Sequence, residues 1–429
     1  MASTTILIKP ETPSLLETVE LSENDIVMPK SYTRFTVFYQ HAARDAIEKL
    51  QTSLSTTLVS FPIVAGTMHF NAENGNISVT TNDRGVPFDV RTSSMTLESL
   101  KPFKHEEIPM DLSVTLDQAL LWPLMVKITT FADGGIAVAV GMQHAIADGH
   151  SVFAFVKYWA SICSMGHANG LPTPIHSRRI LDPLRDARNV LQPPEFKLVD
   201  PAIVKYPSVL PAVRATMFHF SIESLARLKA EAASKSVGRF VSTQDALSAL
   251  IWRCCVRAWV IPSDTQAKLG FACNGRNKTI PPQGDGYFGN SNWFPLPILD
   301  VSALTGPDGL SKAADMIRAE IEKINDDKIR DTSAWIHSIE NKLHITYTFT
   351  ASKRIGGADF TLTSWRFGMY DIQFFGERPM SVRQTGQLNW DGLATIFDAA
   401  DGGTDVYIGL VAESMDKLEK DSEFIKFTS

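Results

Sequence analysis

Cysteine is rare in this sequence, which has 4 cysteines in 429 residues. They are Cys163, Cys254, Cys255 and Cys273, and their spacing matches neither a metal site nor the paired framework of a secreted domain. The adjacent pair lies in a helical pattern, so we expect both thiols to be packed rather than bridged. We therefore expect a reducing compartment and no metal.

Long hydrophobic runs and a strong net charge are also missing. No apolar run reaches the roughly 20 residues that a membrane span needs, and the amino terminus shows no basic stretch followed by an apolar one. We therefore expect a cytoplasmic protein that does not enter a membrane. The formal net charge is -6, and no clustered basic surface indicates nucleic acid. A small molecule is the expected ligand.

The length and patterning predict two domains. A chain of 429 residues exceeds one ordinary core, and both halves alternate strand and helix patterns, including a helix predicted over 311–329. The stretch 170–211 is rich in proline and charge, which is typical of a crossover between domains. We therefore predict domains at 1–180 and 215–429, joined by a linker at 181–214.

The most informative stretch is 143–149, which reads Gln-His-Ala-Ile-Ala-Asp-Gly. Before it, residues 135–142 are apolar and follow an Asp-Gly-Gly turn, which predicts one arm of an antiparallel hairpin with 124–131. After it, apolar residues recur at helical spacing, at Val152, Phe155, Val156 and Trp159. His144 is therefore predicted to lie in a strand-to-helix connection.

Such a connection can hold an imidazole over a cleft, and a pKa of about 6.5 lets histidine exchange a proton near neutral pH. Asp148 can orient the loop through an ion pair or hydrogen bonds, and Gly149 is expected to relax the turn. The alternative is chance, because an isolated His-x-x-x-Asp-Gly pattern occurs in roughly a few per cent of chains of this size. His150 is expected to be a surface or core residue.

A second candidate site lies at the start of a helix predicted over 240–253. The hydroxyls of Ser242 and Thr243 fit a helix cap, and helix N-termini also bind phosphate-bearing ligands. Lys235 and Arg239 precede this helix and fit either a solvated face or a phosphate contact.

Several landmarks occur in order along nearly the whole chain. They are Leu21-Ser22 with Asp25, Phe-Pro-Ile-Val-Ala-Gly at 61–66, the hairpin before His144, the Ser242 helix ending in Ile-Trp-Arg, Asn274-Gly-Arg276, Gly-Tyr-Phe-Gly-Asn at 286–290 and Thr363-Ser-Trp365. Together they resemble the BAHD superfamily of CoA-dependent acyltransferases. The resemblance is specifically to its fungal secondary-metabolism branch, which includes trichothecene and ergot-alkaloid acetyltransferases.

This resemblance implies an α/β fold with mixed sheets, in two chloramphenicol-acetyltransferase-like domains. A channel would run between them, with acyl-CoA entering from one face and the acceptor from the other. By the resemblance His144 is the general base, and Asp148 is structural and pairs with Arg276. The expected co-substrate is acyl-CoA, with acetyl-CoA favoured, and we expect no permanently bound cofactor and a monomeric enzyme.

The resemblance also assigns the remaining site residues. Trp365 is the candidate hydrogen-bond donor to the oxyanion, with a core aromatic as the alternative. No Cys or Ser stands in a nucleophile motif, so no acyl-enzyme is expected. The residues assigned to CoA are Lys235, Arg239, Ser242, Thr243, Thr363 and Ser364.

One departure from the family concerns its second signature, Asp-Phe-Gly-Trp-Gly, which in the family is remote from the chemistry and supports the fold. The equivalent stretch here is 370–379, where Gln373 occupies the place of the aspartate. Two rival functions remain. One is a carrier-protein-dependent condensation enzyme, which typically doubles the histidine where this chain has Gln143. The other is a relative that binds CoA without turnover.

Overall fold

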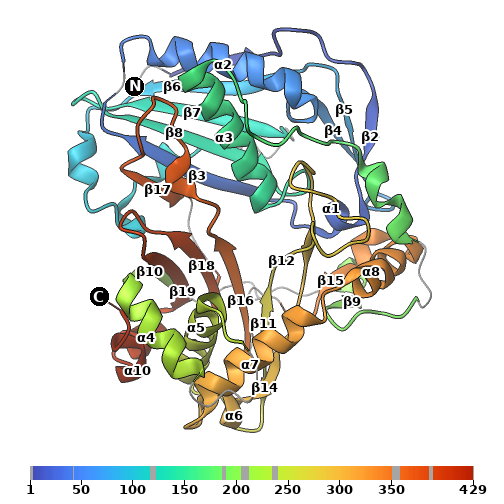
Figure 1. Ribbon diagram of the computed structural model, residues 1–429, viewed down its shortest axis with the longest axis vertical. Helices are drawn as coiled ribbons and strands as arrows, with labels where there is room; N and C mark the ends of the chain where they lie inside the picture. Colours follow the sequence, from blue (N-terminus) through green and yellow to red (C-terminus); the bar gives the residue numbers. More distant parts are fainter. Residues whose placement is uncertain are drawn as a thin grey trace.

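The computed structural model describes residues 3–41, 43–115, 122–185, 190–203, 212–233, 240–349, 358–385 and 390–428. Two six-stranded sheets of mixed strands form two lobes, with strand orders β1-β6-β7-β8-β3-β17 and β10-β19-β18-β16-β11-β14. Figure 1 shows the first lobe above the second, with the N-terminus on the upper lobe and the C-terminus on the lower. The predicted mixed α/β class is confirmed, while the domain limits at 181 and 214 stay a prediction.

The first sheet carries His144 at the end of its fourth strand. Its strands are β1 (Ser3–Ile8), β3 (Tyr32–Tyr39), β6 (Val86–Thr92), β7 (Leu124–Thr130), β8 (Ile136–Gln143) and β17 (Ser381–Gln384). The predicted hairpin is confirmed, because β7 and β8 pair antiparallel. Strand β17 comes from the second half of the sequence and pairs with β3, so the chain returns to the first sheet late.

Two helices, α2 (Ala46–Ser60) and α3 (Gly149–Met165), cover one face of the first sheet (Figure 1). The apolar stripe predicted for α3 is confirmed, because its members are fully buried. Trp159 anchors the helix, since its indole N-H donates to the carbonyl of Leu50 and to the hydroxyl of Ser53 on α2. The helix after His144 is therefore fixed on a packed core.

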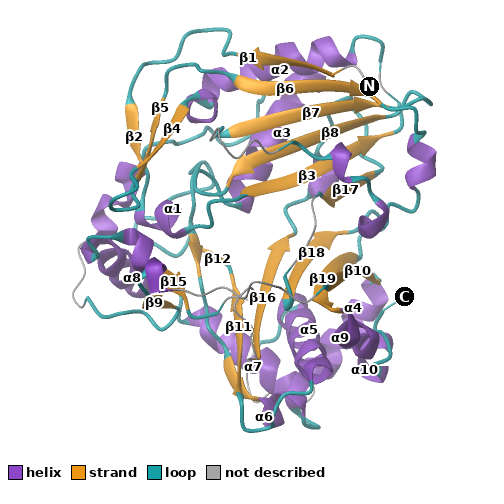
Figure 2. Ribbon diagram, turned by 180° about the vertical axis from the view of Figure 1, so that it is seen from behind, coloured by secondary structure: helices purple, strands orange, loops and turns teal. Residues whose placement is uncertain are grey.

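The second sheet is built from strands β10 (Val213–Phe220), β11 (Gln266–Phe271), β14 (Ile298–Asp300), β16 (Ala358–Trp365), β18 (Leu393–Asp398) and β19 (Thr404–Val411). The helices around it are α4 (Ile222–Ala233), α5 (Thr243–Trp259), α6 (Val301–Thr305), α7 (Gly309–Glu322), α9 (Ala412–Leu418) and α10 (Ser422–Ile425) (Figure 2). Helix α5 forms the centre of this core. It carries Cys254 and Cys255 as free, buried thiols, which confirms their predicted packing.

The single helix predicted over 311–329 is wrong, because the chain forms α7 and then α8 (Asp326–Ser338). Asn325 causes the break: its side chain accepts a hydrogen bond from the amide of Lys328 at 3.0 Å and so starts a new helix. The apolar pattern continues through Ile324, which is why periodicity alone did not reveal the break. No helix of the described stretches is long and apolar enough to cross a membrane.

Smaller elements complete the chain between the lobes. They are β2 (Thr18–Glu20), α1 (Glu23–Val27), β4 (Thr67–Phe70), β5 (Ile77–Thr80), β9 (Phe196–Leu198), β12 (Cys273–Asn274), β13 (Asn292–Trp293) and β15 (Ile345–Tyr347). Strands β9 and β15 pair antiparallel, so part of the predicted crossover is ordered structure.

The connection 366–380, where Gln373 replaces the family's aspartate, is anchored by other groups. Asp398 at the end of β18 accepts the amides of Gly368 and Met369 at 2.9 and 3.2 Å. The hydroxyl of Tyr39 donates to the carbonyl of Ile372 at 2.5 Å. The stretch is therefore held to both sheets without the aspartate.

Candidate active site

His144 directly follows β8, and its backbone is held by two segments from elsewhere in the chain. Its amide donates to the carbonyl of Ser31 at 2.8 Å, and its carbonyl accepts the Nδ2 group of Asn290 at 2.8 Å. The residue as a whole is partly exposed, while its Nδ1 is buried without a hydrogen-bond partner in the described ranges. The backbone is thus fixed, and the ring is not tied to a side chain that would consume its basic nitrogen.

Burial lowers the pKa of His144 below its usual value and outweighs the opposing effects of its own backbone, Asp148, Asn290 and Asp25. The imidazole is therefore neutral at neutral pH. A neutral imidazole can accept a proton, which is the state that a general base requires.

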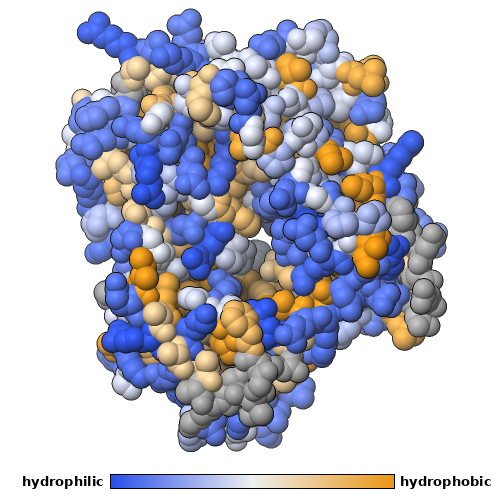
Figure 3. Space-filling model, viewed as in Figure 1, coloured by the Kyte–Doolittle hydropathy of each residue, from blue (hydrophilic) through white to orange (hydrophobic). Residues whose placement is uncertain are grey.

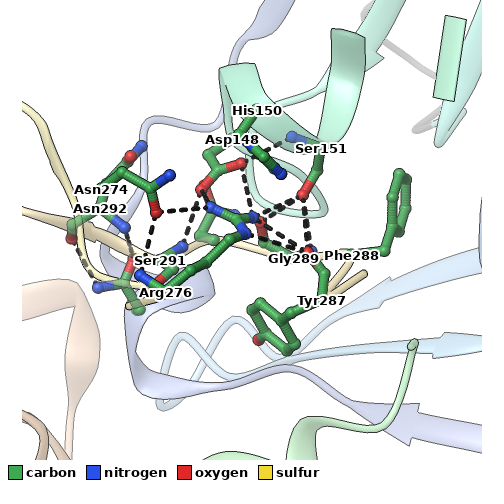
Figure 4. A network of polar contacts seen from close by, with 12 residues as sticks. Asp148, His150, Ser151, Asn274, Arg276, Tyr287, Phe288, Gly289, Ser291 and Asn292 are labelled. Atoms are coloured by element: carbon green, nitrogen blue, oxygen red, sulfur yellow. Dashed lines mark hydrogen bonds and ion pairs between the residues drawn. The ribbon is translucent and has the colours of Figure 1, made fainter. Parts of the chain in front are cut away.

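The carboxylate of Asp148 forms a buried, bidentate ion pair with Arg276. The two pairs of atoms lie 2.8 and 3.0 Å apart, and Arg276 is fully buried (Figure 4). Asp148 also caps α3 by accepting the amide of Ser151 at 2.9 Å, and it accepts the amide of Ser291 at 2.9 Å. The pair expected from the family resemblance is present.

Burial alone would raise the pKa of Asp148. The charge and hydrogen bonds of Arg276, together with the amides of Ser291 and Ser151, overcome this effect and lower the pKa of the carboxyl. Asp148 is therefore ionised, and its two oxygens are fully occupied.

The other donors of Arg276 bind the 274–289 segment of the second half of the chain. They reach the carbonyls of Tyr287 and Gly289 at 3.1 and 3.0 Å and the hydroxyl of Ser151 at 2.8 Å (Figure 4). The pair thus joins the start of α3 to loops that precede and follow β12. This geometry makes Asp148 and Arg276 supports of the His144 loop.

A second buried ion pair, which the sequence did not reveal, lies beside the same loop. Asp25 accepts the Nε of Arg178 at 2.7 Å, and both side chains are buried. Asp25 also forms a capping box with Ser22 and accepts both the amide and the Nδ2 of Asn290, at 2.9 and 2.8 Å. Asn290 therefore connects Asp25 directly to the carbonyl of His144.

Arg178 grips the loop itself. Its guanidinium donates to the carbonyl of Ile146 at 2.9 Å, to that of His176 at 3.1 Å and to that of Phe288. Asp25 was visible as a landmark, but Arg178 lies in the proline-rich crossover, where no motif marked it. The crossover therefore supplies a residue that supports the site.

Gly149 has a role different from the one predicted. It does not relax the turn, because its φ is not positive. A Cβ at this position would lie 2.6 Å from Cε2 of Phe367, whose ring stacks on Phe153 at 5.4 Å. Close packing between the connection after β16 and the start of α3 is what requires glycine here.

Trp365 ends β16 and packs against the first core. It is 8% exposed, and its ring lies 6.1 Å from that of Phe153 on α3 and 5.6 Å from that of Phe397. The core role is therefore shown, while the oxyanion role stays a prediction. Thr363 and Ser364 are partly buried on the same strand, and their contact with CoA also stays a prediction.

Ser242 caps α5, as the simpler interpretation of its hydroxyl predicted. Its Oγ accepts the amide of Asp245 at 3.1 Å, and Asp245 accepts the amide of Ser242 at 2.8 Å. A contact of Ser242 and Thr243 with CoA stays a prediction. Lys235 and Arg239 lie outside the described residues.

A cavity of about 320 Å³ runs along α3. Its wall is largely aromatic and its polar groups are few; among the lining residues are Phe61, Phe153, Tyr158, Phe288, Phe367, His150, Ser151, Lys157 and Asp285. His144 is not part of this wall, so the cavity lies beside the ion-pair network rather than over the base. Figure 3 shows that this face of the molecule is hollowed near its middle, between the two lobes.

One group of side chains in the described ranges has donor atoms close enough to share a metal ion. It consists of Cys254, Asp421 and Glu423. Both carboxylates are already paired with arginine, Asp421 with Arg257 at 2.7 Å and Glu423 with Arg253 at 2.8 Å. Burial raises the pKa of the Cys254 thiol, which opposes the thiolate that a metal prefers. This group is better explained as an ion-pair cluster.

Comparison with known proteins places the chain in a family. A family model described as Transferase family matches residues 2–425. A hydroxycinnamoyltransferase of Narcissus pseudonarcissus is 29% identical over 442 residues, covering 97% of each chain. A hydroxycinnamoyl-CoA:5-hydroxyanthranilate N-hydroxycinnamoyltransferase of Avena sativa is 25% identical, covering 96% of this chain and 97% of the relative.

The fold recurs in a solved structure. TRI101 of F. sporotrichioides, crystallised with coenzyme A and T-2, superposes with a TM-score of 0.79 at 19% identity. The match covers 96% of this chain and 99% of the other. At this identity the likeness establishes the fold, and the two lobes described above agree with it.

Proposed function

Because the chain belongs to this transferase family, that of the BAHD acyl-CoA-dependent acyltransferases, we propose that it transfers an acyl group to a hydroxyl or amine of a small metabolite, with His144 as the general base. The observation that carries the proposal is the geometry of His144. Its ring is neutral, its backbone is held on both sides, and its loop is supported by two buried ion pairs. A positioned base of this kind contributes about 10²- to 10⁴-fold to the rate.

The proposed reaction proceeds in two steps. His144 takes the proton of the acceptor while the acceptor oxygen or nitrogen forms a bond with the thioester carbonyl carbon. The tetrahedral intermediate that results carries its negative charge on the former carbonyl oxygen, toward which the indole N-H of Trp365 is the proposed donor. Collapse breaks the carbon–sulfur bond, and the imidazolium of His144 returns the proton to the CoA sulfur.

The acyl group is the less determined part of this proposal. The sequence landmarks favour acetyl and the fungal secondary-metabolism branch, whereas the names of the relatives above contain hydroxycinnamoyl. Both acyl groups therefore belong in the test. A monomer in the cytoplasm remains the expectation from the sequence.

The rival functions are less well supported. A condensation enzyme of the doubled-histidine type does not fit Gln143, an amide buried at the end of β8. A relative that had lost turnover would have no need to keep a neutral histidine between two costly buried ion pairs.

The test measures release of the free CoA thiol from acetyl-CoA, malonyl-CoA and p-coumaroyl-CoA with a panel of alcohols and amines. Reactions without acceptor correct for hydrolysis, and mass spectrometry identifies the product. The proposal predicts acceptor-dependent release together with a product heavier by the acyl group. If acyl-CoA binds but no member of a broad panel is acylated, the binding relative is favoured; if acyl-CoA does not bind, the acyltransferase proposal fails.

A further inference from the structure

Arg34 lies on the face of the first sheet opposite α2 and α3. Side chains alternate along β3, so Arg34 faces away from Phe35 and Val37, which are buried in the first core. Its strand partner is Gly141 on β8. A Cβ at Gly141 would lie 3.6 Å from Cγ of Arg34 and 2.6 Å from Cγ2 of Val114. The aliphatic stem of Arg34 therefore lies across β8, over the missing side chain.

The guanidinium of Arg34 has no partner in the described part of the chain. It is half-buried, and burial lowers the pKa of Arg34 without an offsetting carboxylate. In contrast, the buried guanidiniums of Arg276 and Arg178 each form an ion pair. A half-buried, unpaired charge costs folding free energy, so a position that keeps one points to a ligand.

A second unpaired cation lies near the same end of the sheet. The guanidinium carbon of Arg84 stacks 3.5 Å from the centre of the Trp122 ring. The carbonyl of Trp122 accepts the hydroxyl of Tyr32 at 2.8 Å, and Tyr32 pairs with Gln143, the residue before His144. Arg84 forms no ion pair with any residue that the structure describes.

The charges at this end of the sheet do not balance. The carboxylates that flank the His144 loop, Asp25 and Asp148, are already neutralised by Arg178 and Arg276. Arg34 and Arg84 remain as positive groups beside the proposed base. This excess favours an anionic ligand near the reacting centre.

We propose that Arg34 binds a carboxylate group of the substrate and so determines which substrate is acylated. The inference rests on the proposed function. His144 lies three residues after Gly141, which is about 10 Å along an extended strand. The pantetheine arm separates the CoA phosphates from the thioester by many bonds, so an anion this close to His144 belongs to the acyl group or to the acceptor. Arginine suits a carboxylate, because its planar fork can donate two parallel hydrogen bonds.

Two sources can supply this carboxylate. The first is an acidic acceptor, of which 5-hydroxyanthranilate and shikimate are practical probes. The second is a dicarboxylic acyl group, of which malonyl-CoA is a practical probe. The experiment compares each acid with its neutral counterpart: the methyl esters for the acceptors, and acetyl-CoA for malonyl-CoA.

Steady-state kinetics would be measured for the wild type, Arg34→Met and Arg34→Lys. The control is Arg91→Gln, which removes an arginine from β6 of the same sheet. We expect the wild type to prefer one acid over its neutral counterpart by about 10- to 100-fold in kcat/KM. This ratio should collapse to near unity in Arg34→Met, recover in part in Arg34→Lys and stay unchanged in Arg91→Gln. An effect on the acceptor ratio assigns the carboxylate to the acceptor, and an effect on the malonyl-to-acetyl ratio assigns it to the acyl group.

The proposal is overturned if Arg34→Met leaves both ratios unchanged. It is also overturned if this variant raises the KM of every acyl-CoA by the same factor, because that result would indicate a contact with the common CoA moiety. Since Arg34 is unpaired, Arg34→Met should keep or raise the melting temperature, which separates a ligand role from a structural one.

Failure of the proposed function would be recognised separately, because then no acceptor would be acylated by the wild type. In that event the shift in melting temperature caused by each acid and its ester still tests Arg34 by binding alone. A larger shift with the acid that is lost in Arg34→Met supports the proposal, and equal shifts contradict it.

Discussion

Two buried ion pairs flank the loop that carries His144, and they hold it in different ways. Asp148 and Arg276 form a bidentate pair that joins α3 to the 274–291 segment. Asp25 meets Arg178 through one nitrogen, and the rest of that guanidinium binds backbone carbonyls, including that of Ile146. The first pair concentrates its hydrogen bonds on a side chain, whereas the second distributes them over the backbone.

This difference predicts how each pair fails. Arg276 would lose its only counter-ion among the described side chains if Asp148 were removed. Asp25 would keep hydrogen bonds from Ser22 and Asn290 if Arg178 were removed. The first pair should therefore matter more for stability, and the second should act mainly through the position of the loop.

The largest effect is expected for Asp148→Ala, which leaves a fully buried guanidinium without its counter-charge. We expect a loss of about 3–5 kcal/mol in the free energy of unfolding, measured by urea denaturation. Adding Arg276→Met to this variant should recover part of the loss, because the unpaired charge is removed. An unaltered urea midpoint in Asp148→Ala would contradict the buried pair.

Arg178→Met should have a smaller effect on stability, about 1–3 kcal/mol, because the remaining donors still satisfy Asp25. Activity should fall as well, since the carbonyl of Ile146 loses its donor and the loop loosens. If Arg178→Met unfolds the protein more readily than Asp148→Ala does, the ranking of the two pairs is wrong.

Asn290→Ala should separate positioning from stability. The amide connects Asp25 to the carbonyl of His144, so its loss should lower kcat about tenfold at a cost of about 1 kcal/mol in stability. Asn292→Ala is the matched control, because the hydrogen bonds between Asn292 and Asn24 use the backbone of Asn292. Equal kcat values for the two variants would remove Asn290 from the positioning set.

The smallest effect concerns pH. Burial lowers the folded-state pKa of His144 below its unfolded value of about 6.5, so the unfolded chain binds the proton more tightly. The neutral ring therefore contributes stability that is complete above about pH 6.5 and is lost as pH falls toward the folded pKa. Asp148, whose pKa is lowered, loses its contribution only at more acidic pH, below about 3.9.

The same shift places the acid limb of the profile of kcat/KM against pH below about pH 6.5. Denaturation of the wild type and of His144→Ala at several pH values measures the contribution of the ring to stability, which should be present in the wild type alone. A rate limb above pH 6.5 would contradict a base whose pKa is lowered by burial.

The contrast between the pairs also explains what the sequence could reveal. His144, Asp148 and Arg276 lie in short motifs, so the amino-acid sequence alone was enough to predict their arrangement. Arg178 was not predictable, because its partner Asp25 lies 153 residues away and no local pattern encodes such a contact. Gly149 was placed correctly but explained wrongly, because its constraint is the ring of Phe367, which only folding brings close.

The same reasoning applies to the fold. The β7–β8 hairpin and the stripe of α3 follow from turn residues and periodicity, both of which are local. The return of β17 to the first sheet depends on pairing between residues 381–384 and 35–38, which is not local. The break before Asp326 depends on one capping side chain, which the apolar pattern conceals.

The most direct test of the account compares wild type and His144→Ala in three measurements: acceptor-dependent CoA release, melting temperature and the dissociation constant for CoA. The account predicts a loss in kcat of about 10²- to 10⁴-fold with the other two values nearly unchanged, because the backbone contacts that hold the loop do not use the ring. A variant that retains most of its kcat would contradict His144 as the general base.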